Sequence, residues 1–163
     1  MMSASTSIRV AGRADAPAIA QLTRQLGYDV PVSTLSERLG RLLPRDDQRF
    51  LVAELDDDVV GWVHVVIAEY VDTGIYAQIA GLVVDKRQRK RGIGQLLMRH
   101  AEEWAHQRGC SIVRLSSSTV RTEAHRFYER LGYTNIKTQY AFVKSIDPRA
   151  DAAIRAFVPR IDG

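Results

Sequence analysis

One stretch of this 163-residue chain decides how it folds: Leu82–Gly94, LVVDKRQRKRGIG. An apolar, β-branched run comes first, a basic segment follows, and Gly92 and Gly94 open a stretch with helical periodicity. The first N–H groups of a helix have no partner within it and carry partial positive charge, so they bind anions. Glycine leaves the backbone accessible to an approaching anion. The stretch therefore predicts a strand–turn–helix unit that binds a diphosphate.

The charge distribution agrees with an anion site in this part of the chain. The sequence has 23 basic and 19 acidic residues, a net charge of +4. Between Lys86 and Arg130 there are 11 basic and 4 acidic residues, whereas the remainder is slightly acidic. This asymmetry favours binding of a phosphorylated cofactor, of nucleic acid or of membrane phosphate.

Hydrophobic periodicity around this stretch predicts a single α/β domain with a mixed sheet and helices on its faces. A Ser33 cap and Pro44 bound the second helix, and the aspartates at 56–58 predict a hairpin turn. The expected strands are 8–10, 50–55, 59–67, 76–84, 112–115 and 139–144. The expected helices are 16–25, 33–43, 93–108 and a last one that carries Ala124 to Leu131 and ends at Gly132. A short helix through Ile154, Phe157 and Val158 is expected in the tail, residues 147–163.

Two phosphate-binding motifs are excluded and a third matches. GxGxxG would need glycine where Leu97 stands, and no P-loop string occurs. R-x-x-G-x-G at Arg89, Gly92 and Gly94 resembles the acyl-CoA pyrophosphate loop of the GNAT superfamily of N-acetyltransferases. Downstream, AHRFYERLGY at 124–133 resembles the late A-x-x-F-Y-x-x-x-G-[YF] signature of the same family. The two motifs occur in the family's order and spacing, and the resemblance runs from Ile8 to Ile146.

The resemblance implies a GNAT domain over 8–146, with a largely antiparallel mixed sheet, and acetyl-CoA as cosubstrate without a metal. The backbone of Leu82, Val83 and Val84 would pair with pantetheine, and an N–H near Val83 would hold the oxyanion. Tyr128 would be the general acid that protonates the CoA thiolate, since a phenol with a pKa of ~10 can share a proton with sulfur. The remaining cofactor positions are Arg89, Lys90, Arg91, Gly92, Ile93, Gly94, Arg121, Ala124 and Tyr128 itself.

Two departures from the family pattern affect the chemistry. Arg121 stands where many members have an asparagine that contacts CoA, and it would contact a phosphate instead. Gln78 and Ala80 occupy the places where many members have a basic glutamate. Glu69, Asp72 and His64 are therefore candidates to remove the amine proton through water, and a weakly basic arylamine would need no base.

The acceptor of the acetyl group is expected to be a small-molecule amine. Its nitrogen would attack the thioester of acetyl-CoA directly. Asp46, Asp47, Glu69 and Asp72 suggest a cationic one. A protein N-terminus or lysine is the alternative acceptor, and a catalytically weak acyl-CoA-binding module is the alternative function.

Other classes of partner and site are not favoured. A nucleic-acid partner is not expected, because no stacking aromatics interleave with the basic run. The four histidines lack metal-site spacing, and the single cysteine, Cys110, is expected to be a small buried residue. No membrane segment or signal sequence is evident, so a cytoplasmic protein is expected, and family habit makes a homodimer one expected assembly.

Overall fold

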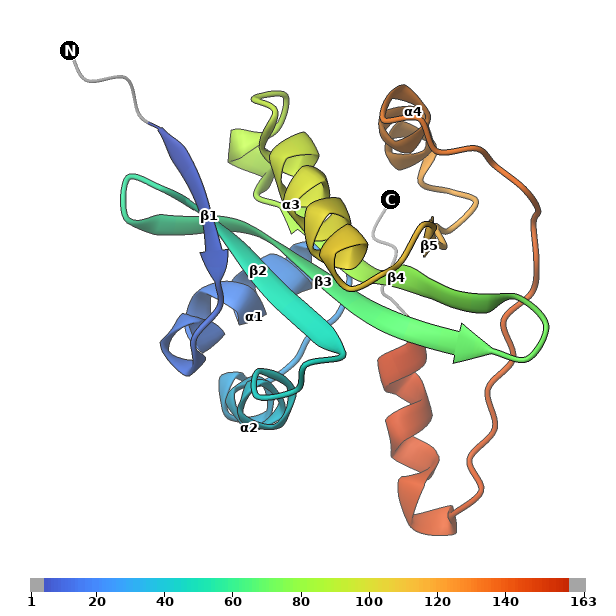
Figure 1. Cartoon of the computed structure of the whole chain (residues 1–163). Coiled ribbons are helices and arrows are strands. Elements are labelled where there is room, and N and C mark those ends of the chain that lie inside the picture. The colour runs from blue at the N-terminus through green and yellow to red at the C-terminus, as the bar shows by residue number, and fades with distance from the viewer. Residues whose placement is uncertain (1–4, 159–163) are drawn as a thin grey trace. The chain divides into compact units, whose positions relative to one another are not determined.

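The computed structural model describes residues 5–158, and the chain divides into two compact units, 1–115 and 116–163. Each unit is described by itself. The first contains a five-stranded sheet in the order β1-β2-β3-β4-β5 (Figure 1). The strands are β1 Thr6–Val10, β2 Gln48–Leu55, β3 Asp58–Tyr70, β4 Gly74–Val84 and β5 Val113–Leu115. Only β4 and β5 are parallel, which confirms a mixed and largely antiparallel sheet.

The β2–β3 hairpin shows how local sequence sets the register of the sheet. Leu55 pairs with Asp58, so Asp56 and Asp57 form a two-residue turn with φ of 50° and 66°. Two consecutive residues with positive φ match the type I′ turn, whose twist suits flanking antiparallel strands. Aspartate tolerates this conformation because its side chain can hydrogen-bond to the local backbone.

Helices cover both faces of the sheet. The helices α1 (Ala16–Gln25) and α2 (Val32–Leu42) pack on one face, and α3 (Ile93–Gln107) lies on the other (Figure 1). On the α1–α2 face, Phe50, Val52, Trp62 and Val83 form the sheet's part of one buried apolar cluster. The predicted Ser33 cap is wrong by two residues, because Pro31 is the N-cap and α2 begins at Val32. Proline suits this position since its fixed φ fits a helix start.

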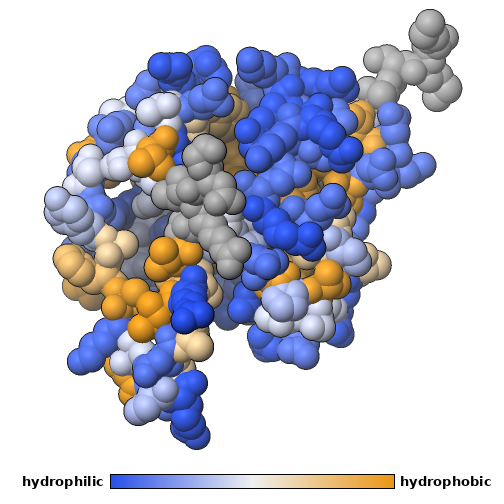
Figure 2. Space-filling view, turned by 180° about the vertical axis from the view of Figure 1, so that it is seen from behind, coloured by the Kyte–Doolittle hydropathy of each residue, from blue (hydrophilic) through white to orange (hydrophobic). Residues whose placement is uncertain are grey.

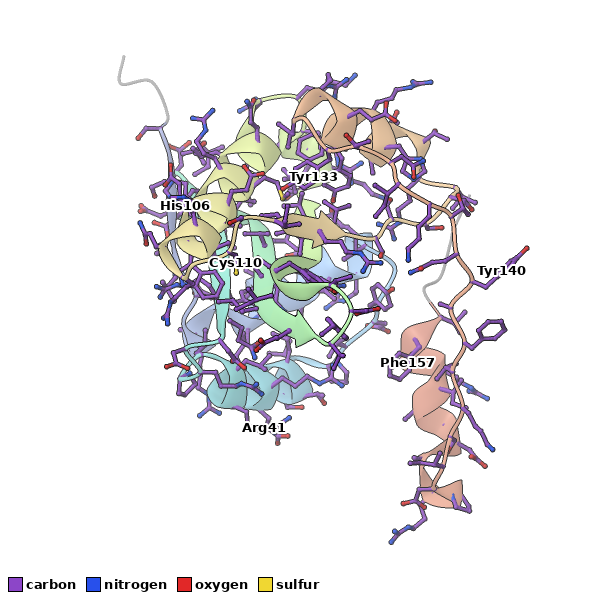
Figure 3. The ribbon with its side chains drawn as sticks, turned by 45° about the vertical axis from the view of Figure 1, so that its right-hand side comes forward. Arg41, His106, Cys110, Tyr133, Tyr140 and Phe157 are labelled. Carbon is purple, nitrogen blue, oxygen red and sulfur yellow. The ribbon has the colours of Figure 1, made fainter. Side chains whose placement is uncertain are left out.

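The second unit contains α4 (Thr122–Arg130) and the 3-10 helix η3 (Pro148–Phe157). η3 lies in the tail where a short helix is expected, and Val158 is its C-cap. The predicted closing strand at 139–144 is wrong, because residues 133–145 form no strand. Within the described part of this unit, residues 116–158, no strand offers the backbone partners that a new strand needs. Tyr140 and Phe157 of this unit are both exposed (Figure 3). Apolar residues are also visible on the face of the molecule drawn in Figure 2.

Candidate acyl-CoA site

The turn between β4 and α3 is built around Asp85. Its carboxylate accepts a hydrogen bond from the Arg87 backbone N–H (3.0 Å) and an ion pair from the Arg87 guanidinium (3.0 Å). These contacts lower the pKa of Asp85 and hold the 3-10 turn η2, Lys86–Gln88. The Lys86 N–H donates to the Gln25 side chain at the end of α1 (2.9 Å). Asp85 and Gln25 therefore fix the first half of the turn, and the Arg87 guanidinium is paired with Asp85 within it.

The second half of the turn exposes cations beside a helix N-terminus. Arg89, Lys90, Arg91 and Gly92 are exposed, and Lys90 and Gly92 have φ of 64° and 79°. These two left-handed residues bring the chain into α3, whose first turn contains no acidic residue. A Cβ at Gly92 would contact no heavy atom within 4 Å, so the glycine is needed for its conformation rather than for space. The arrangement can bind an anionic group through side chains and backbone N–H groups together.

The edge of β4 opens immediately before this turn. β4 pairs with β5 only through Ala77, Gln78 and Ile79. Ala80 is the extra residue of a bulge in the pairing with β3, because His64 pairs with Gly81 and Val65 with Ile79. A bulge bends the strand that contains it. The segment Leu82–Val84 consequently pairs with β3 but has no strand on its other side among the described residues.

Strand alternation decides which N–H groups face this open edge. The Asp85 N–H donates to the Val60 carbonyl on the β3 side (2.8 Å). Alternate residues of an antiparallel strand hydrogen-bond to the same neighbour, so the Val83 N–H also points toward β3. The N–H groups of Leu82 and Val84 point toward the open edge. An oxyanion donor on this part of the strand would therefore be the N–H of Leu82 or Val84 and not that of Val83.

Tyr128 and Arg121 belong to the second unit. The Tyr128 ring makes edge contacts with Phe127 and Tyr133, at centroid distances of 5.2 and 6.0 Å. Burial raises the pKa of Tyr128, and the nearby positive charge of Arg121 opposes this shift. Arg121 is the N-cap of α4, and Ala124 lies in its first turn. Within this unit the structure thus brings Tyr128 and Arg121 close enough to interact.

The α1–α2 face of the sheet continues past the apolar cluster as a polar and aromatic strip. Pairing register puts Gln48, Phe50, His64, Gln78 and Tyr76 on this face, together with Arg114 of β5. His64 Nε2 lies 2.7 Å from Gln48 Oε1, and the Arg114 guanidinium lies 5.8 Å from the Tyr76 ring centroid. Sequence reasoning missed Gln48, Tyr76 and Arg114, because only the register of three strand pairs brings them to His64.

The acidic residues expected around an acceptor are arranged differently. Asp47 is paired with Arg45 at 2.7 Å, which lowers the pKa of Asp47. Glu69 lies an odd number of residues from His64 on β3, so its side chain is on the opposite face. Asp72 is in the β3–β4 turn, beyond the last pair, Tyr70 with Gly74. Neither Glu69 nor Asp72 therefore lies beside His64 on the α1–α2 face.

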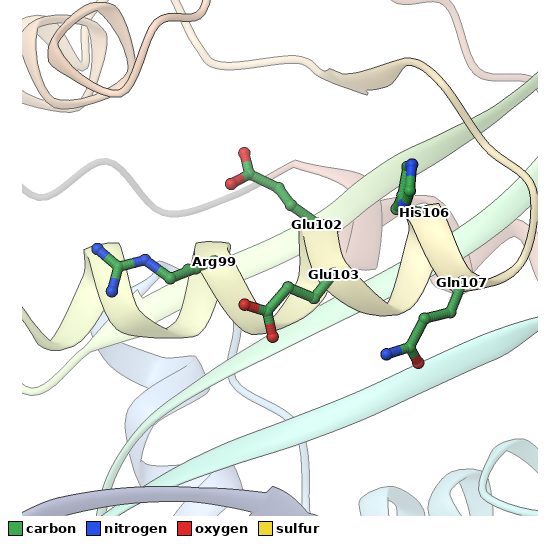
Figure 4. A pocket seen from close by; sticks show the side chains of 5 residues that line it. All are labelled: Arg99, Glu102, Glu103, His106 and Gln107. Atoms are coloured by element: carbon green, nitrogen blue, oxygen red, sulfur yellow. The ribbon is translucent and has the colours of Figure 1, made fainter.

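Other features give no second site. A surface hollow on α3 is lined by Arg99, Glu102, Glu103, His106 and Gln107, all from one helix (Figure 4). Cys110 is buried, as expected. Residues 5–158 contain no cluster of three or more metal-ligating side chains. None of the helices described is both long and apolar enough to cross a membrane.

Strand β4 has an open edge and leads into a basic, glycine-containing helix start. This arrangement is that of an α/β protein suited to bind a phosphorylated ligand. The chain belongs to the acetyltransferase (GNAT) family, whose model matches residues 18–133. An uncharacterized N-acetyltransferase of Chlorobaculum tepidum is 33% identical over 142 residues, which cover 86% of this chain and 83% of that protein.

Two further comparisons agree with this family. The aminoalkylphosphonate N-acetyltransferase of Salmonella typhimurium is 39% identical over 69 residues, 42% of this chain and 44% of that protein. The chain thus spans less than half the length of the first curated relatives that it matches. A solved putative acetyltransferase of Agrobacterium tumefaciens has a TM-score of 0.76 and 25% identity, covering 85% of this chain and 99% of that one.

Proposed function

We propose that this chain transfers an acetyl group from acetyl-CoA to a primary amine of a small molecule. The observation that carries the proposal is the open edge at Leu82–Val84, which leads directly into the exposed cations and the start of α3. In this proposal the edge pairs with the pantetheine amides, and Arg89–Gly94 hold the pyrophosphate. Both parts lie in the first unit and follow each other in the chain.

The proposed reaction is a direct transfer. The amine nitrogen forms a bond to the thioester carbonyl carbon, the N–H of Leu82 or Val84 stabilises the oxyanion, and the C–S bond then breaks. One proton leaves the nitrogen, and Tyr128 gives one to the sulfur. Because burial raises the pKa of Tyr128, its phenol keeps the proton that this step needs at neutral pH.

The charged residues of the polar and aromatic strip beside His64 indicate which charge the acceptor carries. Arg114 brings a positive charge to this face, whereas Asp47 is already paired with Arg45. An amine that also bears an anionic group fits this pattern better than a polyamine does. The Salmonella relative acts on aminoalkylphosphonates by its name, and this supports the same class of acceptor. The cytoplasmic location and the homodimer stay predictions.

Calorimetric titration with acetyl-CoA tests the cofactor site. We expect Arg89→Ala and Gly92→Glu each to weaken binding by about 10-fold, because each removes charge complementarity to the pyrophosphate. Arg41→Ala removes the same charge from an exposed position on α2 and should bind like the parent. Gly92→Asn tolerates positive φ and separates the conformation of Gly92 from the added carboxylate.

The parent protein is then screened for acetylation of propylamine, 2-aminoethylphosphonate and 1,3-diaminopropane by release of the CoA thiol. We expect the phosphonate to be the best of the three acceptors. Binding of acetyl-CoA without turnover of any amine would favour the acyl-CoA-binding module. Absence of acetyl-CoA binding would contradict the proposal and turn attention to salt-sensitive nucleic-acid binding.

A further inference from the structure

The position of His64 in the sheet connects it to the open edge of β4. His64 lies on β3 and pairs with Gly81 of β4, immediately beside the bulge at Ala80. The same bulge marks the end of the pairing between β4 and β5, at Ile79 and Leu115. Neighbouring strands are ~4.8 Å apart, so His64 is one strand away from the place where the edge opens.

The surroundings of the imidazole fix its orientation. Its ring centroid lies 5.3 Å from that of Phe50, which in turn lies 5.0 Å from the Trp62 ring. Trp62 also covers Gly81, since a Cβ there would be 2.7 Å from the indole carbons. His64 itself is only half-buried, so part of the residue reaches the surface.

Gln48 determines which ring nitrogen carries the proton. Its amide oxygen lies 2.7 Å from His64 Nε2, and Gln48 is buried, with 8% of its surface exposed. An amide oxygen only accepts hydrogen bonds, so the contact places the proton on Nε2. In the neutral imidazole the lone pair is then on Nδ1, which can accept a proton.

We infer that His64 takes the proton from the attacking amine, and that Gln48 is the positioning residue that keeps the accepting lone pair on Nδ1. The inference rests on the proposed acetyl transfer and names its missing base. The alkylammonium first loses one proton to Nδ1, which frees the nitrogen lone pair for attack. As the C–N bond forms, the nitrogen loses its second proton to water, and sulfur gains one from Tyr128 as the C–S bond breaks. Exchange with water then restores both side chains.

The other candidates for this role fit the geometry less well. Glu69 is on the opposite face of β3, and Asp72 is in the turn at the far end of the hairpin. About six residue pairs separate that turn from His64, or ~20 Å along the strands. Gln78, on the same face as His64, is an amide and cannot act as a base.

The surroundings of His64 support a neutral imidazole. Burial lowers the pKa of His64. From β5, Arg114 contributes a positive charge to this face; from β4 the titratable neighbour is Tyr76, on which Tyr70 of β3 stacks. Burial disfavours the imidazolium, and the facing residues of β2, Gln48 and Phe50, are uncharged. The neutral imidazole, which is the form that can accept a proton, is therefore favoured.

Kinetics with two acceptors of different basicity test the role of His64. The first is the best alkylamine of the screen, and the second is methoxyamine, a weakly basic amine that is already unprotonated at neutral pH. We expect His64→Ala to lower kcat/KM about 100-fold or more for the alkylamine and less than about 5-fold for methoxyamine. Acetyl-CoA affinity should not change. His106→Ala, at an exposed histidine on α3, is the matched control and should behave like the parent.

The pH profile of Gln48→Glu tests the positioning role. A carboxylate at this position would accept from Nε2 and raise the pKa of His64, so the acid limb of kcat/KM should move to higher pH. An unmoved acid limb, or equal losses for both acceptors in His64→Ala, would overturn the inference, because a merely structural role gives both results.

Nitrogen NMR of the His64 ring gives a readout without an acceptor. We expect a neutral ring with its proton on Nε2 at pH 7, and a ring protonated at pH 7 or carrying its proton on Nδ1 would overturn the inference. If the parent acetylates none of the amines, the proposed function fails by itself, while this spectrum still decides the state of His64.

Discussion

Strand β3 in the first unit and the segment 133–146 in the second have similar sequence patterns but opposite environments. In β3, Val63 and Val65 have no exposed surface, and both neighbouring strands pair with their backbone. In the second segment, Tyr140 and Phe142 are 91% and 93% exposed. The sequence predicts a strand within each, at 59–67 and 139–144, yet only β3 is a strand.

The difference shows that a strand-like apolar sequence does not by itself provide a pairing partner. A strand is stabilised by the backbone of its neighbours and by side chains packed across the pair. β3 joins two strands through short turns, so both of its partners are local in sequence. The second segment follows α4 and has no such neighbour within residues 116–158.

The largest expected effect on stability comes from truncating a buried side chain of the first unit, compared with truncating an exposed one of the second. Leu97 is fully buried on α3, so Leu97→Ala should reduce the free energy of unfolding by ~3 kcal/mol through lost burial and an unfilled cavity. Phe142→Ala should change it by less than ~0.5 kcal/mol. Urea denaturation measures both. A loss above ~2 kcal/mol in Phe142→Ala would show that this ring is buried in solution, and the contrast would disappear.

The next prediction concerns the Tyr128 hydroxyl in the second unit, which we expect to matter for catalysis and not for stability. Tyr128→Phe should lower turnover about 100-fold, because the phenol proton is lost, while acetyl-CoA affinity and unfolding stay unchanged. Tyr140→Phe, at an exposed ring of the same unit, is the matched control. Since the pKa of Tyr128 is raised, the alkaline decline of the parent should lie above the ordinary phenol pKa of ~10. Equal turnover in both variants would remove Tyr128 from the mechanism.

Close packing in the sheet predicts a smaller loss at Gly81. A Cβ there would lie 2.7 Å from the Trp62 ring, so Gly81→Ala must displace the indole and should reduce stability by ~2 kcal/mol. Gly74 has a φ of 76° but open space around it, and Gly74→Ala should lose ~1 kcal/mol from backbone strain alone. Tryptophan fluorescence should shift only in the first variant. Equal fluorescence in both would mean that Trp62 does not rest on Gly81.

The smallest effect compares two ion pairs. Asp15 accepts from Arg9 (2.8 Å) and from the Gly12 N–H (2.7 Å), and these bonds lower the pKa of Asp15. Its stabilisation is therefore present above the unfolded-state pKa of ~3.9 and is lost as pH falls through the lowered folded-state pKa.

Unfolding at several pH values measures this difference. At pH 7 Asp15→Asn should be ~1 kcal/mol less stable than the parent, and the gap should close in acid. Asp147 pairs with Arg149 at a similar distance, 3.0 Å, but its side chain is 43% exposed against 12% for Asp15. Asp147→Asn should therefore be indistinguishable from the parent. A gap for Asp15→Asn that persists in strong acid would point to lost packing instead of lost charge.

The sequence predicted those parts of the molecule whose causes are local. The β4–α3 turn depends on its own glycines, and the aspartates at 56 and 57 set the hairpin that aligns β2 with β3. The pair of Gln48 and His64 could not be predicted, because the residues are 16 positions apart and meet only through that alignment. The error at 139–144 has a related cause, since no local signal states whether an edge is available for pairing.

The bulge at Ala80 has a consequence for insertions and deletions in this strand. Ala80 is exposed and has no partner on β3, while Ile79 and Gly81 pair with consecutive residues, Val65 and His64. Removing Ala80 would therefore keep every side chain of β4 on its present face and leave the core unchanged. It would also straighten the strand and let β5 continue alongside Leu82–Val84. Deletion of this one residue would thus give a folded sheet in which β5 covers the Leu82–Val84 edge, the edge that we propose pairs with pantetheine.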